Sequence, residues 1–230
     1  ITARPLSLSG SRIYDSTTSV AASDLSTMTN LVGSETVILS GNGVIGNKNV
    51  ADSIALTNVS GLSLGDGSNG GLASNYTLSG GTHTVNVTKR PITISGSKTY
   101  DGSTTVQNSS ISTLTNRAGG ETLNISGSGT VNSAAVGTNK TISLGSLALT
   151  DNSGLASNYE LSSGSFDINV RDVTFVGTRH YDGTTDANTS NFTAAFSNLV
   201  SGEDLNLTGT GSVASKNVAS GQSISLGSIA

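Results

Sequence analysis

The sequence predicts an all-β protein that consists of tandem modules, and three observations support this prediction. The composition is rich in glycine, with 29 residues, and poor in aromatic side chains, at 4%. Apolar residues alternate with Ser, Thr and Asn along several short segments, which is the period-two pattern of half-buried strands. One ordered series of motifs occurs three times. The first two observations indicate strands, and the third indicates repeated small domains.

The residue types also argue against helices. Ser, Thr and Asn side chains hydrogen-bond to nearby backbone groups and glycine is flexible, so all four compete with helix formation. The apolar residues are chiefly Val, Ile and Leu, and the β-branched Val and Ile fit the pleated surface of a sheet.

The first expected element of each copy is a strand that begins with an arginine. Residues 4–10 read Arg-Pro-Leu-Ser-Leu-Ser-Gly and residues 90–96 read Arg-Pro-Ile-Thr-Ile-Ser-Gly. Residues 171–177 follow the pattern loosely, with Asp172 in place of the proline. The alternation places the apolar side chains on one face, which we expect to lie in a core.

A tight turn is expected next, at a tyrosine–aspartate motif that every copy contains. Asp-Gly after a short strand favours a turn with a left-handed glycine, and the tyrosine is expected to cap the core beside it. The tyrosines are 86 and 81 residues apart, which exceeds the roughly 20–50 residues of solenoid repeats and is typical of a small domain. The motif residues are Tyr14, Asp15, Tyr100, Asp101, Gly102, Tyr181, Asp182 and Gly183.

Further strands follow in each copy. A glutamate precedes an alternating run in all three copies, at Glu35, Glu121 and Glu203. Two copies then continue into Gly-Leu-Ala-Ser-Asn-Tyr and a last alternating strand, which the third copy lacks. The Asn-Tyr pairs are Asn75, Tyr76, Asn158 and Tyr159. We therefore predict modules at residues 1–89, 90–170 and 171–230, the third of them C-terminally incomplete.

The spacing of these segments suggests an architecture. About six or seven short strands per copy, separated by Gly, Asn and Ser clusters, predict antiparallel sheets in an Ig-like β-sandwich. Two alternatives stay open: β-grasp-like modules, with a short helix at residues 111–117, and a parallel β-helix, which favours a shorter period. The join at residues 87–92 contains Pro91 and no Gly/Ser linker, so we expect a stiff, elongated array.

Charge and composition exclude several kinds of protein. A net charge of −4 provides no basic stripe for phosphates, so no nucleic acid partner is expected. No apolar run reaches the roughly 18 residues of a membrane helix, so neither a membrane span nor an export signal is expected in this fragment. Cysteine is absent, which excludes disulfides and thiolate metal sites.

The titratable residues suggest no catalytic site, and we expect neither an enzyme nor a cofactor. His83 and His180 occupy unrelated places in their copies, and no Ser/His/Asp arrangement stands out. Calcium is the one metal considered. The aspartates of the turn motif, with the three glutamates, are weak candidate ligands, because one or two carboxylates per module fall short of the roughly six to eight oxygens that Ca²⁺ takes. These candidates are Asp15, Asp101 and Asp182.

The motifs together resemble a known family. The Arg-Pro opening, Tyr-Asp-Gly-Thr-Thr, the Gly-Glu or Ser-Glu step and the Ala-Ser-Asn-Tyr ending are similar to the YDG-type repeat domains of large Gram-negative bacterial surface adhesins, typically filamentous-haemagglutinin-like exoproteins. The resemblance covers essentially the whole chain. Ser16 stands where the family has glycine, which places that turn in question. The resemblance implies secretion, display at the cell surface and a role in cell adhesion or biofilm formation, with no active site.

The expected function is therefore structural. A stiff series of modules is suited to act as the stalk or spacer of an adhesin, with the neighbouring repeat modules as its partners and a monomer as its state. The alternative is a module that binds a host or cell-surface glycan or protein directly, through its polar faces, loops or edge strands.

Overall fold

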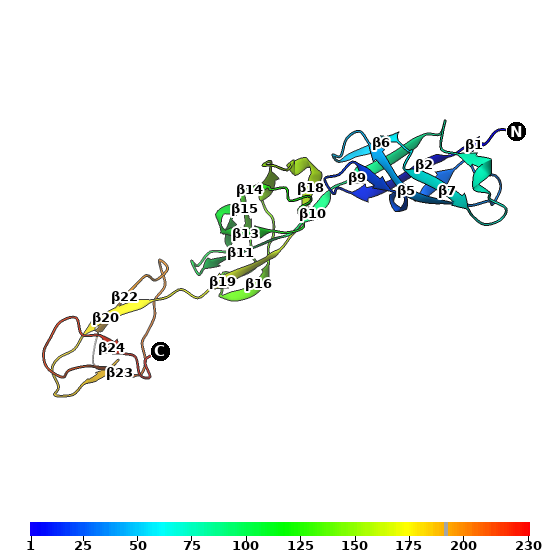
Figure 1. Ribbon diagram of the computed structural model, residues 1–230. Helices are drawn as coiled ribbons and strands as arrows, with labels where there is room; N and C mark the ends of the chain where they lie inside the picture. The colour runs from blue at the N-terminus through cyan, green and yellow to red at the C-terminus, as the bar shows by residue number, and fades with distance from the viewer. Residues whose placement is uncertain (191–192) are drawn as a thin grey trace. The chain divides into compact units, whose positions relative to one another are not determined.

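The computed structural model describes residues 1–190 and 193–230, and its fold is all-β, as predicted (Figure 1). The helical segments in these residues are single 3-10 turns. The described residues contain no helix with the length and apolar character needed to cross a membrane. We call the predicted modules repeats 1, 2 and 3. Contacts divide the chain into two compact units. Unit 1 is Ile1–Lys98, Thr104–Ser133 and Gly137–Asp167, and unit 2 is Thr99–Ser103, Ala134–Val136 and Ile168–Ala230.

Repeat 1 is built around one mixed sheet with the strand order β3-β5-β6-β9-β2-β4. Strand β7 pairs with β5 outside this path, and β1 pairs with β8. The elements are β1 (Arg4–Pro5), β2 (Ser7–Ile13), β3 (Ser19–Ala21), η1 (Ala22–Asp24), β4 (Thr27–Thr29), β5 (Val37–Ile45), β6 (Ala51–Asn58), β7 (Leu62–Asp66), η2 (Ala73–Asn75), β8 (Tyr76–Thr77) and β9 (His83–Thr88).

Repeat 2 repeats the central part of this arrangement in the order β13-β11-β19-β16. Three smaller pairs complete it: β10 with β18, β12 with β15, and β14 with β17. The elements are β10 (Arg90–Ile92), β11 (Ile94–Thr99), β12 (Thr105–Gln107), η3 (Asn108–Ser110), β13 (Ile111–Leu114), β14 (Asn124–Ser126), β15 (Ser128–Thr130), β16 (Gly137–Thr141), β17 (Ala148–Thr150), η4 (Ala156–Asn158), β18 (Tyr159–Leu161) and β19 (Ser165–Asn169).

Repeat 3 forms two separate sheets in its described residues. Strand β20 pairs with β22 in an antiparallel manner, and β23 lies between β21 and β24. The strands are β20 (Thr174–Thr178), β21 (Asp186–Asn188), β22 (Thr193–Ser197), β23 (Thr210–Val213) and β24 (Ile224–Ser225).

Strands β2 and β9 of repeat 1 pair in parallel, so the prediction of antiparallel sheets was wrong for this pair. Strands β2 and β9 run side by side from the pair Leu8↔His83 to the pair Ile13↔Thr88, while β6 pairs with β9 in an antiparallel manner. A parallel pair requires a long connection, and nearly the whole repeat connects β2 to β9. The Ig-like assignment stays a prediction. The helix of the β-grasp-like alternative is not formed, because Ile111–Leu114 is strand β13.

Part of the core of each complete repeat comes from apolar side chains in and beside its opening and closing strands. Four of these side chains in repeat 1 are at most 1% exposed: Leu6, Leu8, Val85 and Val87. The corresponding positions of repeat 2 are at most 2% exposed: Ile92, Ile94, Phe166 and Ile168. The alternation read from the sequence therefore identifies the core face, where burial of apolar surface provides the main favourable free energy of folding.

The glycine that ends the opening motif marks a close approach of two backbone segments. A Cβ at Gly10 would lie 1.8 Å from the carbonyl oxygen of Asp24, and a Cβ at Gly96 would lie 2.0 Å from that of Ser110. These two carbonyls belong to η1 and η3. The motif therefore requires glycine here because no side chain fits between the strand and the 3-10 turn.

Candidate functional site at the junction of repeats 1 and 2

The tyrosine–aspartate motif forms the same turn in all three repeats. The aspartate Oδ1 accepts the backbone N–H of the residue two positions later, at 2.8 or 2.9 Å, which is an Asx turn; the pairs are Asp15–Thr17, Asp101–Ser103 and Asp182–Thr184. The intervening residues Ser16, Gly102 and Gly183 have φ values of 67°, 72° and 81°. Ser16 thus adopts the left-handed conformation of the family's glycine, at a conformational cost.

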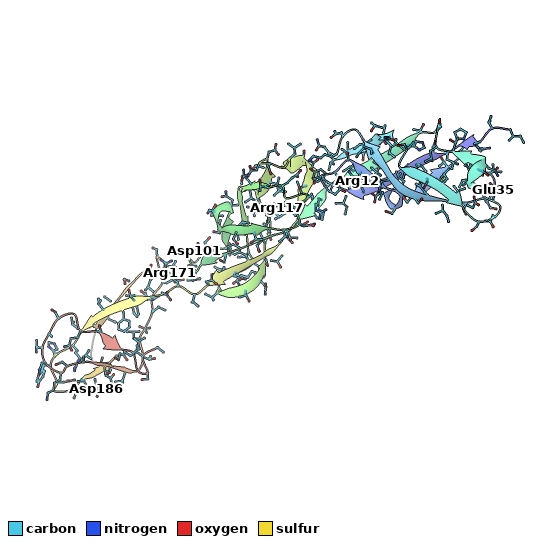
Figure 2. The ribbon with its side chains drawn as sticks, in the orientation of Figure 1. Arg12, Glu35, Asp101, Arg117, Arg171 and Asp186 are labelled. Carbon is cyan, nitrogen blue, oxygen red and sulfur yellow. The ribbon has the colours of Figure 1, made fainter. Side chains whose placement is uncertain are left out.

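These contacts make the aspartates part of the turn. Asp15 also pairs with Arg12 at 2.8 Å, and Asp182 pairs with Arg179 at 2.6 Å. Figure 2 labels Arg12 of the first turn and Asp101 of the second. The backbone N–H of Thr184, and then Arg179, lower the pKa of Asp182 to about 2. In the part of the chain that the structure describes, no three His, Asp or Glu side chains gather as a metal site would require. The aspartates were only weak candidates for calcium ligands, and calcium binding stays untested.

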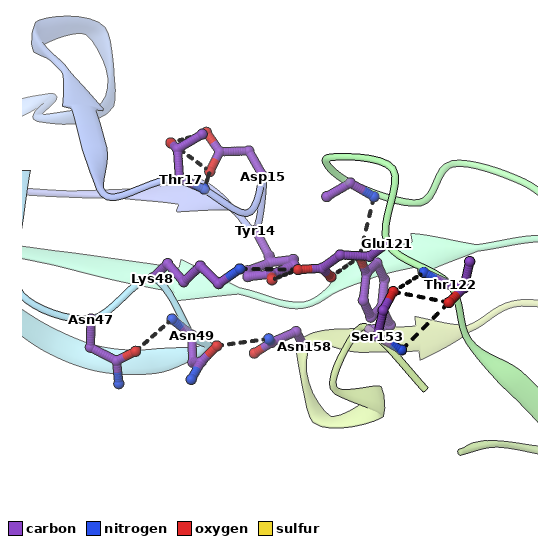
Figure 3. A network of polar contacts seen from close by, with 12 residues as sticks. Tyr14, Asp15, Thr17, Asn47, Lys48, Asn49, Glu121, Thr122, Ser153 and Asn158 are labelled. Carbon is purple, nitrogen blue, oxygen red and sulfur yellow. Dashed lines mark hydrogen bonds and ion pairs between the residues drawn. The ribbon is translucent and has the colours of Figure 1, made fainter. Parts of the chain in front are cut away.

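A carboxylate of repeat 2 accepts hydrogen bonds from both sides of the junction (Figure 3). The Tyr14 hydroxyl of repeat 1 donates to Glu121 Oε1 at 2.7 Å, and the Tyr159 hydroxyl of repeat 2 donates to Glu121 Oε2 at 2.7 Å. Lys48 Nζ of repeat 1 lies 3.1 Å from Glu121 Oε1. The two tyrosine rings meet edge to face, with centroids 5.4 Å apart, a favourable aromatic geometry. We call these four residues the junction cluster.

A second contact beside the junction cluster involves the buried side chain of Asn158. Its Oδ1 accepts the backbone N–H of Val50 at 2.9 Å, and its Nδ2 donates to Asn49 Oδ1 at 2.9 Å. Asn158 therefore bridges from repeat 2 to two consecutive residues of repeat 1. Since its side chain is 1% exposed, these partners replace the water that it would otherwise bind.

The junction cluster shifts the pKa values of its members in directions that favour the charge-assisted bonds. Burial, and then the hydrogen bond to Glu121, raise the pKa of Tyr159 to about 12 and raise that of Tyr14 as well. Burial would raise the pKa of Glu121, but hydrogen bonds from Tyr159, Tyr14 and Lys48 outweigh it and lower the pKa. The hydrogen bond to Glu121 raises the pKa of Lys48. At neutral pH the cluster thus consists of one carboxylate, one ammonium and two neutral phenols.

These directions predict a stability plateau for unit 1 between about pH 5 and pH 10. The tyrosine contribution is fully present below the unfolded pKa, near 10, and is lost as the pH rises through the folded value of about 12 for Tyr159. The Glu121 contribution is present above its unfolded pKa and is lost as the pH falls through its lowered folded value. Thermal unfolding across pH should show the alkaline decline, and Tyr14→Phe with Tyr159→Phe should reduce it. Equal declines in both proteins would contradict this assignment.

Asn158→Ala is expected to lower the stability of unit 1 by about 1–2 kcal/mol, because it leaves the Val50 N–H and the Asn49 amide without their partner. The matched control is Asn75→Ala, at the same motif position of repeat 1. Since Asn75 is exposed, its replacement should change stability by less than about 0.5 kcal/mol. Urea unfolding measures both, and equal losses would show that Asn158 has no special role at the junction.

Parts of the junction cluster recur elsewhere in the chain. Within repeat 1, Tyr76 donates to Glu35 and accepts the backbone N–H of Val32, as Tyr159 does with Glu121 and Ala118. Within unit 2, the Tyr100 hydroxyl donates to Glu203, and Arg171 Nη1 donates to the Tyr100 carbonyl at 3.2 Å. The latter bond repeats that of Arg90 Nη1 to the Tyr14 carbonyl, at 3.3 Å. The tyrosine of one repeat and the glutamate of the next therefore form a repeated contact.

Only some of the predicted motif residues lie at the junction of repeats 1 and 2. It brings Tyr14, Asn158 and Tyr159 together, whereas Asn75 is exposed. Tyr14 is buried and Tyr100 is half-buried, but Tyr181 is 63% exposed and does not cap a core as expected. Sequence reasoning missed that the recurring glutamate accepts from tyrosines. The available signal was that a glutamate and a tyrosine each recur at a fixed place in every copy.

A comparison with protein families supports the threefold pattern. A family model described as "YDG domain" matches residues 2–85, 84–166 and 167–230. A search of curated proteins found no significant match, and neither did a search of solved structures.

Proposed function

Because the chain belongs to the YDG domain family, with three copies of the domain in series, we propose that it is a structural stalk or spacer region of a secreted bacterial surface adhesin that supports cell adhesion or biofilm formation. The proposal assigns no catalysis to the chain and places it outside the cell, at the bacterial surface. Its partners are the neighbouring repeats of the same chain.

The junction cluster is the observation that carries this proposal. A spacer must keep adjacent modules from separating or rotating under mechanical load. We therefore expect some polar side chains of a spacer to form hydrogen bonds or ion pairs between modules. Glu121 has donors from both repeats, and its side chain is only 12% exposed. A charge-assisted hydrogen bond in such a place is stronger than one on an open surface.

The covalent join between repeats 1 and 2 adds to this support. Strand β9 ends at Thr88 and β10 begins at Arg90, so a single residue, Lys89, separates them. Arg90 also donates from its side chain to the Tyr14 carbonyl and to Asn116. A join of one residue, with hydrogen bonds from Arg90 to both repeats, lacks the conformational flexibility of a Gly/Ser linker.

Small-angle X-ray scattering of the chain tests the proposal. A compact globule of this length would have a radius of gyration of about 17 Å, and we expect a value at least about 1.5 times larger for a spacer. A compact particle would contradict the proposal. The same sample should not bind a glycan array or host cells above background, since such binding would favour the alternative of a direct binding module.

A further inference from the structure

The residue after the tyrosine–aspartate motif differs between repeats 1 and 2, although the turn is the same. Ser16 has a φ of 67° and Gly102 has a φ of 72°, and both turns contain the Asx hydrogen bond. A serine in this left-handed region carries a conformational cost that glycine avoids. A strained residue persists where its surroundings hold it. The reason for Ser16 therefore lies in what its side chain contacts.

The side chain of Ser16 lies against the backbone of the next repeat. A Cβ at Gly119 of repeat 2 would lie 2.1 Å from Ser16 Oγ and 3.0 Å from Ser16 Cβ. The hydroxymethyl group of Ser16 thus occupies the space that a side chain at position 119 would need, since atoms in a packed contact do not approach so closely. Ser16 is accordingly half-buried.

Within unit 2, the equivalent contact has its side chain on the opposite partner. A Cβ at Gly102 of repeat 2 would lie 2.9 Å from Cγ1 and 4.0 Å from Cβ of Val200 in repeat 3. The turn here has no side chain, and the following repeat supplies one. Val200 is half-buried.

Val200 of repeat 3 occupies the same place as Ala118 of repeat 2. The backbone N–H of Glu121 donates to the Ala118 carbonyl at 2.9 Å, and that of Glu203 donates to the Val200 carbonyl at 3.0 Å. Both contacts therefore bring the Asx turn of one repeat against the turn that precedes the glutamate of the next. Because Val200 lies so close to the Cβ position of Gly102, the equivalent Ala118 is expected to lie close to the Ser16 side chain.

The sizes of the facing residues are matched at each contact. Ser16 faces the small residues Ala118 and Gly119, whereas Gly102 faces the larger Val200. The position of Gly119 is also filled by a larger residue in repeat 3, Ser201. A serine facing Val200 would overlap with it, and a glycine facing Ala118 and Gly119 would leave a gap. Overlap and gap both destabilise a packed contact.

We propose that these residues determine which repeat can pack after which, an inference that rests on the proposed spacer function. The face of repeat 1 that carries Ser16 fits a following YDG domain with alanine and glycine at the positions of Ala118 and Gly119. The face of repeat 2 that carries Gly102 fits a following YDG domain with valine at the position of Val200. The repeats are therefore not interchangeable in their order.

The charges at the two contacts agree with selective pairing. Lys48 Nζ of repeat 1 lies 3.1 Å from Glu121 Oε1 of repeat 2. The position of Lys48 holds Ala134 in repeat 2. Repeat 1 thus brings a cation to the glutamate of the following repeat from this position, and repeat 2 does not.

A double-mutant cycle of Ser16→Gly and Ala118→Val tests the first contact in the full chain. Urea unfolding should show that Ala118→Val raises the unfolding equilibrium constant of unit 1 about tenfold or more, because two added methyl groups overpack the contact. In the Ser16→Gly background the increase should be severalfold smaller. The matched control is Val32→Ala, at the position of Ala118 in repeat 1. Val32 contacts Tyr76, so its effect and that of Ser16→Gly should be independent.

A second cycle, of Gly102→Ser and Val200→Ala, tests the contact in unit 2. The conformational cost of Gly102→Ser is the same in both backgrounds, so the cycle isolates the contact with Val200. Gly102→Ser should destabilise unit 2 severalfold more in the wild-type background than in the Val200→Ala background. If Ala118→Val or Gly102→Ser prevents folding, the partner substitution should restore it.

Independent effects in either cycle, or a partner substitution that worsens the first, would overturn the proposal. These outcomes are distinct from a failure of the spacer function. An elongated chain in small-angle scattering with independent effects would reject selective pairing alone, whereas a compact chain with coupled effects would reject the spacer alone.

Discussion

Glu121→Ala is expected to lower the stability of unit 1 by about 2–4 kcal/mol and to uncouple the unfolding of repeats 1 and 2. The substitution removes the common acceptor of Tyr14, Tyr159 and Lys48. Both phenols are buried, at 0% and 3% exposure, so water cannot fully replace the carboxylate. The wild-type unit should unfold in one transition and the variant in two.

Glu35→Ala is the matched control for this experiment. Glu35 occupies the same motif position and accepts from Tyr76, which lies in its own repeat. Its replacement should therefore cost about 1 kcal/mol and leave the unfolding of the two repeats coupled. Urea unfolding followed by hydrogen exchange reports each repeat separately. If the two alanine variants behave alike, the junction cluster does not couple the repeats.

The junction shows what a repeated sequence can and cannot reveal. Tyr14, Asn158 and Tyr159 were identified because they recur at fixed places, yet the recurring Glu121 was considered only as a weak oxygen ligand for calcium. Tyr14 and Glu121 are 107 residues apart. A repeat pattern shows that both residues matter to every copy, but not that the tyrosine of one copy meets the glutamate of the next, because that contact depends on how two folded repeats meet.

The fold, like the junction, could be predicted from the sequence only in part. Period-two alternation identified the core side chains Leu6, Leu8, Val85 and Val87, because the alternation fixes which face of a strand is apolar. It does not determine which strand lies beside which, or in which direction. The parallel pairing of β2 with β9 therefore could not be derived from the pattern, although the long connection between these strands allowed it.

Phe166→Ala is expected to destabilise repeat 2 by about 3–5 kcal/mol, the largest effect of a single substitution that we predict. Phe166 is fully buried in β19, which lies between β11 and β16. Its removal loses the transfer free energy of the ring and leaves a cavity at the centre of the repeat. Phe166→Leu should cost much less, about 1–1.5 kcal/mol, and Leu155→Ala, at a 44% exposed position, should change stability by less than about 1 kcal/mol.

The effect of Phe166→Ala on repeat 1 distinguishes coupled repeats from independent ones. Unfolding of repeat 2 withdraws Glu121 and Asn158 from Tyr14, Asn49 and Val50, so repeat 1 should lose hydrogen-exchange protection although none of its own residues has changed. In the double variant with Glu121→Ala, this loss in repeat 1 should be smaller than the sum of the two single losses, because both substitutions break the same contact. Strictly additive losses, or an unaffected repeat 1, would mean that each repeat is stable without its neighbour.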